Sequence, residues 1–213
     1  MKHTDKMLFV SGIDTDAGKS YATGWIARQM MDRGLRVATL KLVQTGNEGS
    51  SEDIAVHRRI MGTELPEDAE LITAPQIFSY PASPHLATRI DGREIDFDRI
   101  DRCAELLAER YDMVLIEGAG GLMVPLTDEM LTIEYPQKRG IGVVLVTNGR
   151  LGSINHTILS LEALERRGMR IDTVAYNHHF DNDPVIAPDT RNFIARYVER
   201  HFPATRIVDI PSL

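Results

Sequence analysis

Cysteine is nearly absent from this sequence: Cys103 is the one cysteine among 213 residues. An internal disulfide is therefore excluded. Its spacing from Ile100, Leu107 and Tyr111 places Cys103 on the apolar face of an expected helix, so we interpret it as an inert core residue.

Long apolar runs and basic clusters are missing as well. No stretch approaches the roughly 20 apolar residues of a membrane span, and the N-terminus lacks a signal-type apolar segment. The net charge is −7, and no run of lysine or arginine forms a basic segment within this acidic chain. Such a chain is not expected to bind nucleic acid or a membrane surface by neutralising phosphates. We expect a cytoplasmic protein whose partners are small molecules or proteins.

Apolar residues make up 43% of the chain, which suffices for one sizeable core, so we expect a single α/β domain over residues 1–213. Short apolar runs, which predict buried parallel strands, occupy residues 8–10, 37–40, 113–116, 143–146 and 174–176. Helical spacing of apolar residues occupies 20–33, 97–110 and 154–167. This alternation predicts a doubly wound, mostly parallel sheet flanked by helices. Residues 62–84 hold four prolines and predict an irregular excursion from that sheet.

The most informative segment is residues 7–21, whose pattern predicts a buried strand, a phosphate-binding loop and a helix start. In such a loop backbone N–H groups surround phosphate oxygens, Lys19 reaches the β- and γ-phosphates, and the Ser20 hydroxyl binds Mg²⁺. The usual spacing places a glycine where Ile13 stands, and the nearest glycine, Gly12, comes one residue early. The alternative is a surface turn that happens to contain Gly-Lys-Ser. The apolar strand before the loop and the helical pattern after it favour nucleotide binding.

Polar and glycine-rich residues follow each expected strand, where open parallel sheets bind their ligands. They include Lys41 and Thr45 after the second strand, Glu117 with its glycines after the third, and Asn148 and Asn177 after the fourth and fifth. Because the carboxyl ends of parallel strands meet at one edge, we expect a site assembled from several strand ends.

Two carboxylates and a lysine in this set suit phosphoryl chemistry. Glu117 ends the third apolar strand and Asp53 opens the segment after the second, so both can face a phosphate-bound Mg²⁺. Lys41 is placed to neutralise a transferring phosphoryl group or an anionic substrate. Two plainer interpretations stay open: Asp53 as a helix cap, and Lys41 as a solvated loop lysine.

Five motifs occur together in order and carry a resemblance. They are Gly-Ile-Asp-Thr-Asp-Ala-Gly-Lys-Ser from Gly12, Lys-Leu-Val-Gln-Thr-Gly from Lys41, Ser-Pro-His from Ser83, Glu-Gly-Ala-Gly-Gly from Glu117 and Leu-Gly-Ser-Ile-Asn-His from Leu151. With them the chain, from about residue 7 to 180, resembles the dethiobiotin synthetase family, whose fold is P-loop NTPase-like.

The resemblance implies an ATP- and Mg²⁺-dependent ring closure in biotin synthesis. In this reaction 7,8-diaminononanoate takes up CO₂ as a carbamate, ATP phosphorylates the carbamate, and the neighbouring amine displaces phosphate. Lys41 matches the family's catalytic lysine, and Lys19 assists on the triphosphate. The metal ligands are expected to be Ser20, Asp53 and Glu117.

The remaining site residues come from the same resemblance. Nucleotide binding is expected from Asp16, Ala17, Gly18, Lys19, Ser20, Tyr21, Asp53, Glu117, Gly118, Ala119, Gly120, Asn177 and Pro211. Substrate binding is expected from Thr15, Lys41, Thr45, Gly121, Leu122, Leu151 and Asn155. The family acts as a homodimer, in which residues 151–155 come from the second subunit and bind the substrate carboxylate. The plainer interpretation of Ser153 and Asn155 is helix capping.

Recognition of the base is where the chain departs from the family. Asn177 matches the asparagine that reads adenine, but Tyr-Asn-His-His replaces the usual Asn-Asp pairing, and a segment that longer members carry beyond Pro211 is missing. We therefore predict a relaxed preference for the nucleotide base, with equal turnover of ATP, CTP and GTP. The adjacent His178 and His179 are not expected to share a metal ion, because neighbours in an extended segment point opposite ways. His85 lies in the family-like Ser-Pro-His segment without an assigned role.

Three rival functions fit less well. A P-loop switch ATPase of the partitioning or division-site type needs a second lysine early in the phosphate loop, and residues 12–17 contain none. An amide-forming relative from cobalamin synthesis carries a glutamine-hydrolysing domain with a nucleophilic cysteine, for which this chain has no room. A degenerate binding module would have lost some of the residues Lys19, Ser20, Lys41, Asp53 and Glu117, which are all present.

Overall fold

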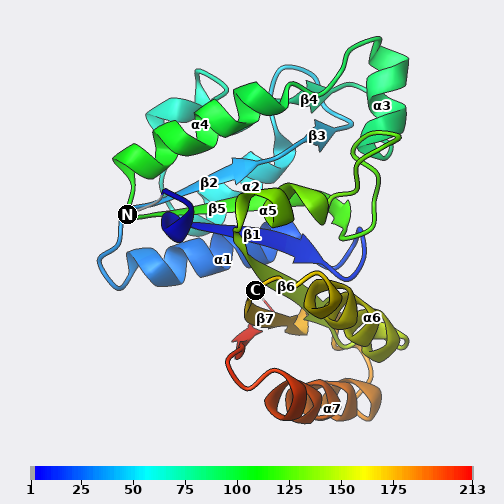
Figure 1. The fold of residues 1–213 in the computed structure, drawn as a ribbon. Helices are drawn as coiled ribbons and strands as arrows, with labels where there is room; N and C mark the ends of the chain where they lie inside the picture. Colours follow the sequence, from blue (N-terminus) through cyan, green and yellow to red (C-terminus); the bar gives the residue numbers. More distant parts are fainter. Residues whose placement is uncertain (1–2, 213) are drawn as a thin grey trace.

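The computed structural model describes residues 3–212 and is built on a six-stranded, entirely parallel sheet (Figure 1). The strand order is β2-β5-β1-β6-β7-β8. Their bounds are β1 Met7–Gly12, β2 Val37–Lys41, β5 Met113–Gly121, β6 Gly142–Asn148, β7 Ile171–Asn177 and β8 Arg206–Ile210. All five strands expected from the sequence are confirmed, and β8 is an additional edge strand beside β7.

Helices cover both faces of the sheet, as expected for a doubly wound fold. Seven α-helices lie in the described part of the chain: α1 Lys19–Met31, α2 Glu52–Met61, α3 Pro84–Asp91, α4 Phe97–Arg110, α5 Glu134–Arg139, α6 Ser153–Arg166 and α7 Ile186–His201. Helix α1 packs on one face and is flanked by α2, whereas α4, α5, α6 and α7 pack on the other face. No helix among residues 3–212 is long and apolar enough to cross a bilayer.

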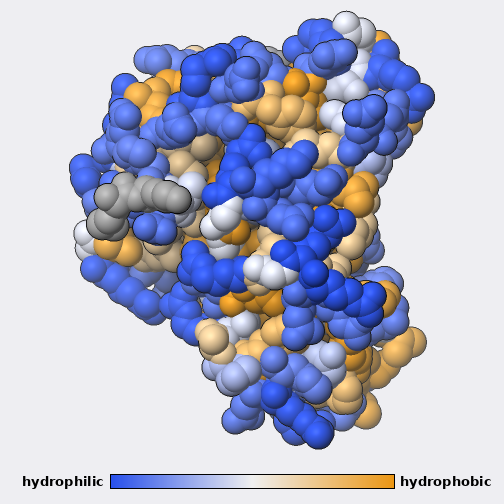
Figure 2. All heavy atoms as spheres, viewed as in Figure 1, coloured by the Kyte–Doolittle hydropathy of each residue, from blue (hydrophilic) through white to orange (hydrophobic). Residues whose placement is uncertain are grey.

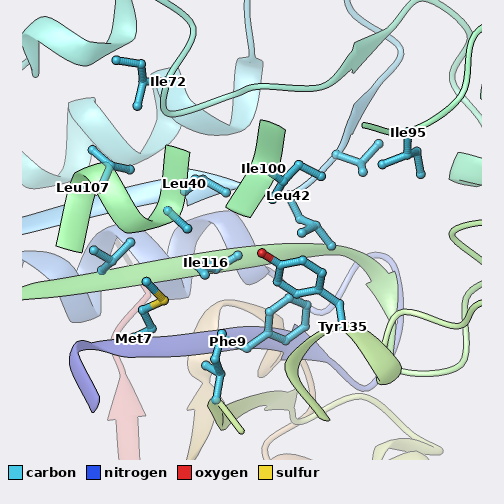
Figure 3. Packing of buried hydrophobic residues seen from close by; sticks show 14 of the residues in the cluster. Met7, Phe9, Leu40, Leu42, Ile72, Ile95, Ile100, Leu107, Ile116 and Tyr135 are labelled. Atoms are coloured by element: carbon cyan, nitrogen blue, oxygen red, sulfur yellow. The ribbon is translucent and has the colours of Figure 1, made fainter. Parts of the chain in front are cut away.

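The alternation of side chains along each strand divides the core between these two faces. Phe9 and Leu40 point toward α4, where Ile100 and Leu107 are fully buried (Figure 3). Full burial of each such aliphatic side chain contributes about 1.5–3 kcal/mol. The ring of Tyr135 from α5 lies 6.0 Å from that of Phe9 and closes this layer. The strands are therefore buried on both sides, which is why they read as unbroken apolar runs.

The three predicted helices are confirmed within two residues at each end. Helix α4 begins where Asp96 accepts a hydrogen bond from the Arg99 backbone N–H, which caps the helix. Cys103 is half-buried on this helix and packs against the core, and burial raises the pKa of its thiol. Both observations agree with an inert core residue.

Residues 62–84 leave the main sheet as predicted, but they are not wholly irregular. They contain a 3₁₀-helix, Pro66–Asp68, and a short strand β4, Ile77–Phe78, which pairs in parallel with β3, Gln44–Thr45. Strands of two residues are too short to give a periodic signal. This small sheet continues from the end of β2 and positions the residues after Lys41.

Candidate active site

The loop between β1 and α1 has the geometry of a phosphate-binding loop. Gly18 adopts φ +84° at the start of α1, a conformation that favours glycine. A Cβ at Gly12 would come within 2.8 Å of the Asp14 carbonyl oxygen, so this early position is also restricted to glycine. This loop therefore has its first glycine at position 12, one residue earlier than in the usual spacing.

Lys19, the first residue of α1, folds back over this loop. Its Nζ donates hydrogen bonds to the carbonyl oxygens of Asp14 at 3.1 Å and Thr15 at 2.7 Å. Burial lowers the pKa of Lys19 to about 8, although the nearby Glu117 opposes this. The ammonium is therefore still largely charged at pH 7 and is held against the carbonyl oxygens of the loop.

Ser20, Lys41, Asp53 and Glu117 meet at the mouth of the loop. The Ser20 hydroxyl lies 2.6 Å from Asp53 Oδ1 and 2.9 Å from Glu117 Oε1. Lys41 Nζ lies 2.5 Å from Asp53 Oδ2 and 2.8 Å from Glu117 Oε1, and also donates to the Gly118 carbonyl at 3.1 Å. Residues from α1, β2, α2 and β5 thus converge, as expected from the strand ends.

Burial makes the charges in this cluster interdependent. Burial alone would raise the pKa of the Glu117 carboxyl, but the Lys41 ammonium outweighs it and holds that pKa well below its usual range. Burial would also lower the pKa of Lys41, but Glu117 and Asp53 outweigh this effect and raise it. Glu117 and Lys41 are therefore both charged near pH 7.

The plainer interpretations of Asp53 and Lys41 are wrong. Helix α2 is capped by Ser51, whose hydroxyl accepts from the Ile54 backbone N–H, so Asp53 lies inside the first turn and faces the cluster. Lys41 is 5% exposed and is not a solvated loop lysine.

The donor set of Ser20, Asp53 and Glu117 fits a nucleotide-bound Mg²⁺. No group of three or more His, Cys, Asp or Glu side chains within residues 3–212 could hold a metal ion alone. A magnesium ion that binds with phosphates does not need one, because it takes one or two carboxylates and keeps water and phosphate oxygens as its other ligands. One hydroxyl and two carboxylates, all oxygen donors, meet that requirement.

These groups line a cleft of about 520 Å³. Its lining includes the predicted residues Thr15, Asp16, Gly18, Lys19, Ser20, Lys41, Thr45, Asp53, Glu117, Ala119 and Gly120. Four lining residues were not predicted as site residues: Val43, Gln44, Arg150 and Phe180. The Arg150 guanidinium stacks 3.9 Å from the centre of the Phe180 ring. An aromatic three residues past a strand end is the signal that could have identified Phe180.

The other predicted residues lie around this cleft. Ala17 is buried beneath the loop, and Gly118 follows Glu117 on β5. Asn177 ends β7 opposite Ile210 of β8, so Pro211 lies beside it. A Cβ at Gly18 would collide with Asn177 Nδ2, which shows that Asn177 packs on the phosphate loop. Tyr21 follows Ser20 in the first turn of α1.

The predicted substrate residues Gly121 and Leu122 line a second groove of about 740 Å³ between β5 and α6. Leu151 and Asn155 lie at the exposed start of α6, and Leu151 is 86% exposed. The capping interpretation of this turn is wrong, because Gly152 occupies the cap position without a side-chain hydrogen bond and Ser153 donates to Asn148 instead.

The adjacent histidines His178 and His179 make different contacts. His178 and His179 lie in a 3₁₀-helix, His178–Phe180, rather than in an extended segment, which corrects the premise of the sequence argument. They nevertheless diverge, because both ring nitrogens of His178 contact Asp181 and Asp209 while His179 packs edge-on against Phe180. His85 contacts the Ser83 hydroxyl at 3.0 Å.

A larger groove of about 1250 Å³ lies along the outer side of α2 and the 62–74 segment. Its lining contains none of Lys19, Ser20, Lys41 and Glu117, so its size does not make it the reaction site.

Comparison with known proteins agrees with this geometry. The family model described as an AAA domain matches residues 6–213. The chain is 46% identical over 211 residues to the ATP-dependent dethiobiotin synthetase BioD 2 of Pasteurella multocida, covering 98% of this chain and 99% of the relative. It is 49% identical over 207 residues to the ATP-dependent dethiobiotin synthetase BioD of Chlorobaculum tepidum, covering 96% and 87%. A GTPase structure from Pyrococcus abyssi matches with a TM-score of 0.52 at 17% identity, over 92% of this chain and 75% of that one, and shows the fold alone.

Proposed function

The chain belongs to the family of ATP-dependent dethiobiotin synthetases, and we propose that the cleft around Lys41 closes the ureido ring of dethiobiotin from 7,8-diaminononanoate, CO₂ and ATP. The observation that carries this proposal is the convergence of Lys41, Asp53 and Glu117 on the phosphate loop, where the Lys41 ammonium and the Ser20 hydroxyl each lie within 3 Å of both carboxylates. In this reaction one substrate amine takes up CO₂ as a carbamate, and the γ-phosphoryl group of ATP moves to a carbamate oxygen. The second amine then attacks the carbonyl carbon, loses its proton and expels phosphate.

Lys41 is the catalytic group in this proposal. Its ammonium is fixed by three hydrogen bonds at the end of β2, in the same cleft as Lys19. A fixed cation stabilises the transition state most where the negative charges of the carbamate and the phosphoryl group approach each other. No protein nucleophile is needed, because the substrate amine is the nucleophile.

The phosphate loop and Lys19 bind the triphosphate, and Ser20, Asp53 and Glu117 would hold Mg²⁺. When bound, Mg²⁺ supplies positive charge to the phosphate oxygens of ATP. The N-terminus of α1 adds its positive dipole end at the same place. The stacked Arg150 and Phe180 offer flat faces for the base.

We propose that the protein acts as a homodimer in the cytoplasm. The surface around α6 supports this, because Leu151, Leu159 and Met123 are 86%, 58% and 50% exposed, and Figure 2 shows hydrophobic residues reaching the surface at the edge where α6 lies. A second copy covering this surface would bring Leu151 and Asn155 to the groove beside Gly121. Sedimentation of the wild type and of Leu159→Asp tests this, with a dimer expected for the first and a weaker dimer for the second.

The decisive experiment is phosphate release from ATP and Mg²⁺ with bicarbonate, with and without 7,8-diaminononanoate, followed by mass detection of the cyclic urea. We expect release that depends on the diamine and yields dethiobiotin. Slow release that is indifferent to the diamine would contradict the proposal and favour a switch-type ATPase.

A further inference from the structure

His57 is a buried histidine that contacts Glu117, at the carboxylate oxygen that Ser20 and Lys41 do not contact. It lies on α2 one turn after Asp53 and is 0% exposed. Its Nε2 is 2.6 Å from Glu117 Oε2, and its Nδ1 is 3.0 Å from the hydroxyl of Thr39 on β2. The motifs that carry the family resemblance do not include it.

The ionised carboxylate fixes the direction of the hydrogen bond between His57 and Glu117. An ionised Glu117 only accepts, so His57 Nε2 must donate to it. Arg58 Nη1 donates to Thr39 Oγ1 at 2.9 Å, and the same hydroxyl contacts His57 Nδ1. Arg58, Thr39, His57 and Glu117 therefore form a continuous chain of hydrogen bonds that ends on Glu117 Oε2.

The far end of the chain is anchored as well. Arg58 Nε and Nη2 donate to the two oxygens of Asp68 at 2.7 and 2.8 Å. Asp68 also accepts from the Thr73 hydroxyl at 2.6 Å. The 3₁₀-helix that contains Asp68 therefore fixes Arg58, and through Thr39 and His57 it restrains the rotamer of Glu117.

In this arrangement the two carboxylate oxygens of Glu117 have different partners. Oε2 accepts from His57, whereas Oε1 faces Ser20 and Lys41 in the cleft. Glu117 can then offer one oxygen to a metal ion rather than two. Mg²⁺ requires a near-ideal octahedral arrangement of oxygen ligands, whereas Ca²⁺ accepts six to eight ligands and often a carboxylate that binds through both oxygens.

We propose that His57 is a positioning residue that makes Glu117 a one-oxygen metal ligand and thereby favours Mg²⁺ over Ca²⁺ at the nucleotide site. This inference rests on the proposed function, because it requires that Ser20, Asp53 and Glu117 hold the metal of a bound nucleotide. It differs from a purely structural role, in which His57 would contribute packing without affecting which metal is bound.

The test measures metal preference without turnover. Full-length wild type, His57→Leu and His57→Gln are titrated with the Mg²⁺ complex and separately with the Ca²⁺ complex of a non-hydrolysable ATP analogue. We expect His57→Leu to weaken binding of the Mg²⁺ complex about tenfold, the scale seen when a group supporting a metal ligand is removed, and to weaken the Ca²⁺ complex less. His57→Gln should restore most of the Mg²⁺ preference, because its amide can donate to Oε2.

Two further variants separate an effect on the preference for Mg²⁺ over Ca²⁺ from an effect on folding. Thr39→Val removes the hydroxyl between Arg58 and His57, and we expect it to shift the preference in the same direction as His57→Leu. Leu107→Ala, on α4 at the other face of the sheet, should lower the melting temperature without changing the preference. If His57→Leu does not fold, Thr39→Val and His57→Gln still decide the question.

The outcomes separate this inference from the proposed function. A wild type that binds neither metal–nucleotide complex and shows no diamine-dependent phosphate release would overturn the proposed function. A wild type that binds and turns over, with the same ratio of Mg²⁺ to Ca²⁺ affinity in all variants, would overturn the role of His57 alone. A ratio that falls in His57→Leu and Thr39→Val and recovers in His57→Gln supports it.

Discussion

Replacing Lys41 with methionine keeps a side chain of similar length but removes the ammonium between Asp53 and Glu117. The Lys41 side chain is 6% exposed, and its Nζ lies 2.5 and 2.8 Å from the two carboxylates. After the change, these carboxylates share the Ser20 hydroxyl without a cation between them. Removing one partner of a buried ion pair costs about 3–5 kcal/mol of unfolding free energy. For a chain of this size the melting temperature should fall by roughly 10 °C.

Lys41→Met should also lower kcat, independently of its effect on stability. Loss of a fixed charge that acts on the transition state lowers kcat by about 10²–10³. We expect diamine-dependent phosphate release to fall by that factor while kcat/KM falls in parallel, because the interaction is made in the transition state. The assay is run well below the melting temperature of the variant, with circular dichroism confirming that it is folded.

Two comparisons make this prediction refutable. Lys138→Met changes an exposed lysine of α5 and should alter neither stability nor rate. The double variant Lys41→Met/Asp53→Asn removes one of the two carboxylate charges that lost their cation, so it should recover part of the lost stability but none of the activity. If folded Lys41→Met keeps more than about a tenth of the wild-type kcat, the transition-state role of Lys41 is refuted.

Three other perturbations have expected outcomes. Gly18→Ala places a Cβ at φ +84° against Asn177, so the unfolding free energy should drop by at least about 1–2 kcal/mol and the KM for ATP should rise; unchanged thermal melting and KM would contradict this. Hydrogen bonds from Arg58 and Thr73 outweigh burial and lower the pKa of Asp68 below its usual 3.8, so the stability they add is present above that pH and disappears as the pH falls below it. Asp68→Asn should therefore cost about 1 kcal/mol in denaturant unfolding at pH 7 and less below about pH 4, and a cost that stays constant with pH would be evidence against this pairing. Relaxed base preference stays a prediction: kcat/KM should be equal for ATP, CTP and GTP, and a strong preference for ATP would overturn it.

The stacked surface of Arg150 and Phe180 gives this last prediction a structural reason. Aromatic and guanidinium faces stack on any base and carry little hydrogen-bond selectivity. Asn177 Oδ1 already accepts the backbone N–H of His179, so this carbonyl is engaged by the protein.

The sequence by itself determined the parts of the fold that depend on local pattern. Strands β1, β2, β5, β6 and β7 contain unbroken apolar runs because both of their faces are buried, and α4 follows the helical spacing of apolar residues over 97–110. Strand β8 gave no such signal, because it lies at the sheet edge and most of its residues are partly exposed. Helix α2 was anticipated only as a possible cap at Asp53.

The sequence also determined which chemistry the chain carries, because the carboxyl ends of parallel strands must meet at one edge. The sequence alone therefore predicts that Lys41, Glu117 and the phosphate loop lie together. Tertiary structure alone decided that His57 contacts Glu117, since this depends on how α2 packs beside β2 after the turn that follows Lys41. It likewise decided that Arg150 stacks on Phe180. Such contacts join residues that are distant in sequence, and no local periodicity encodes them.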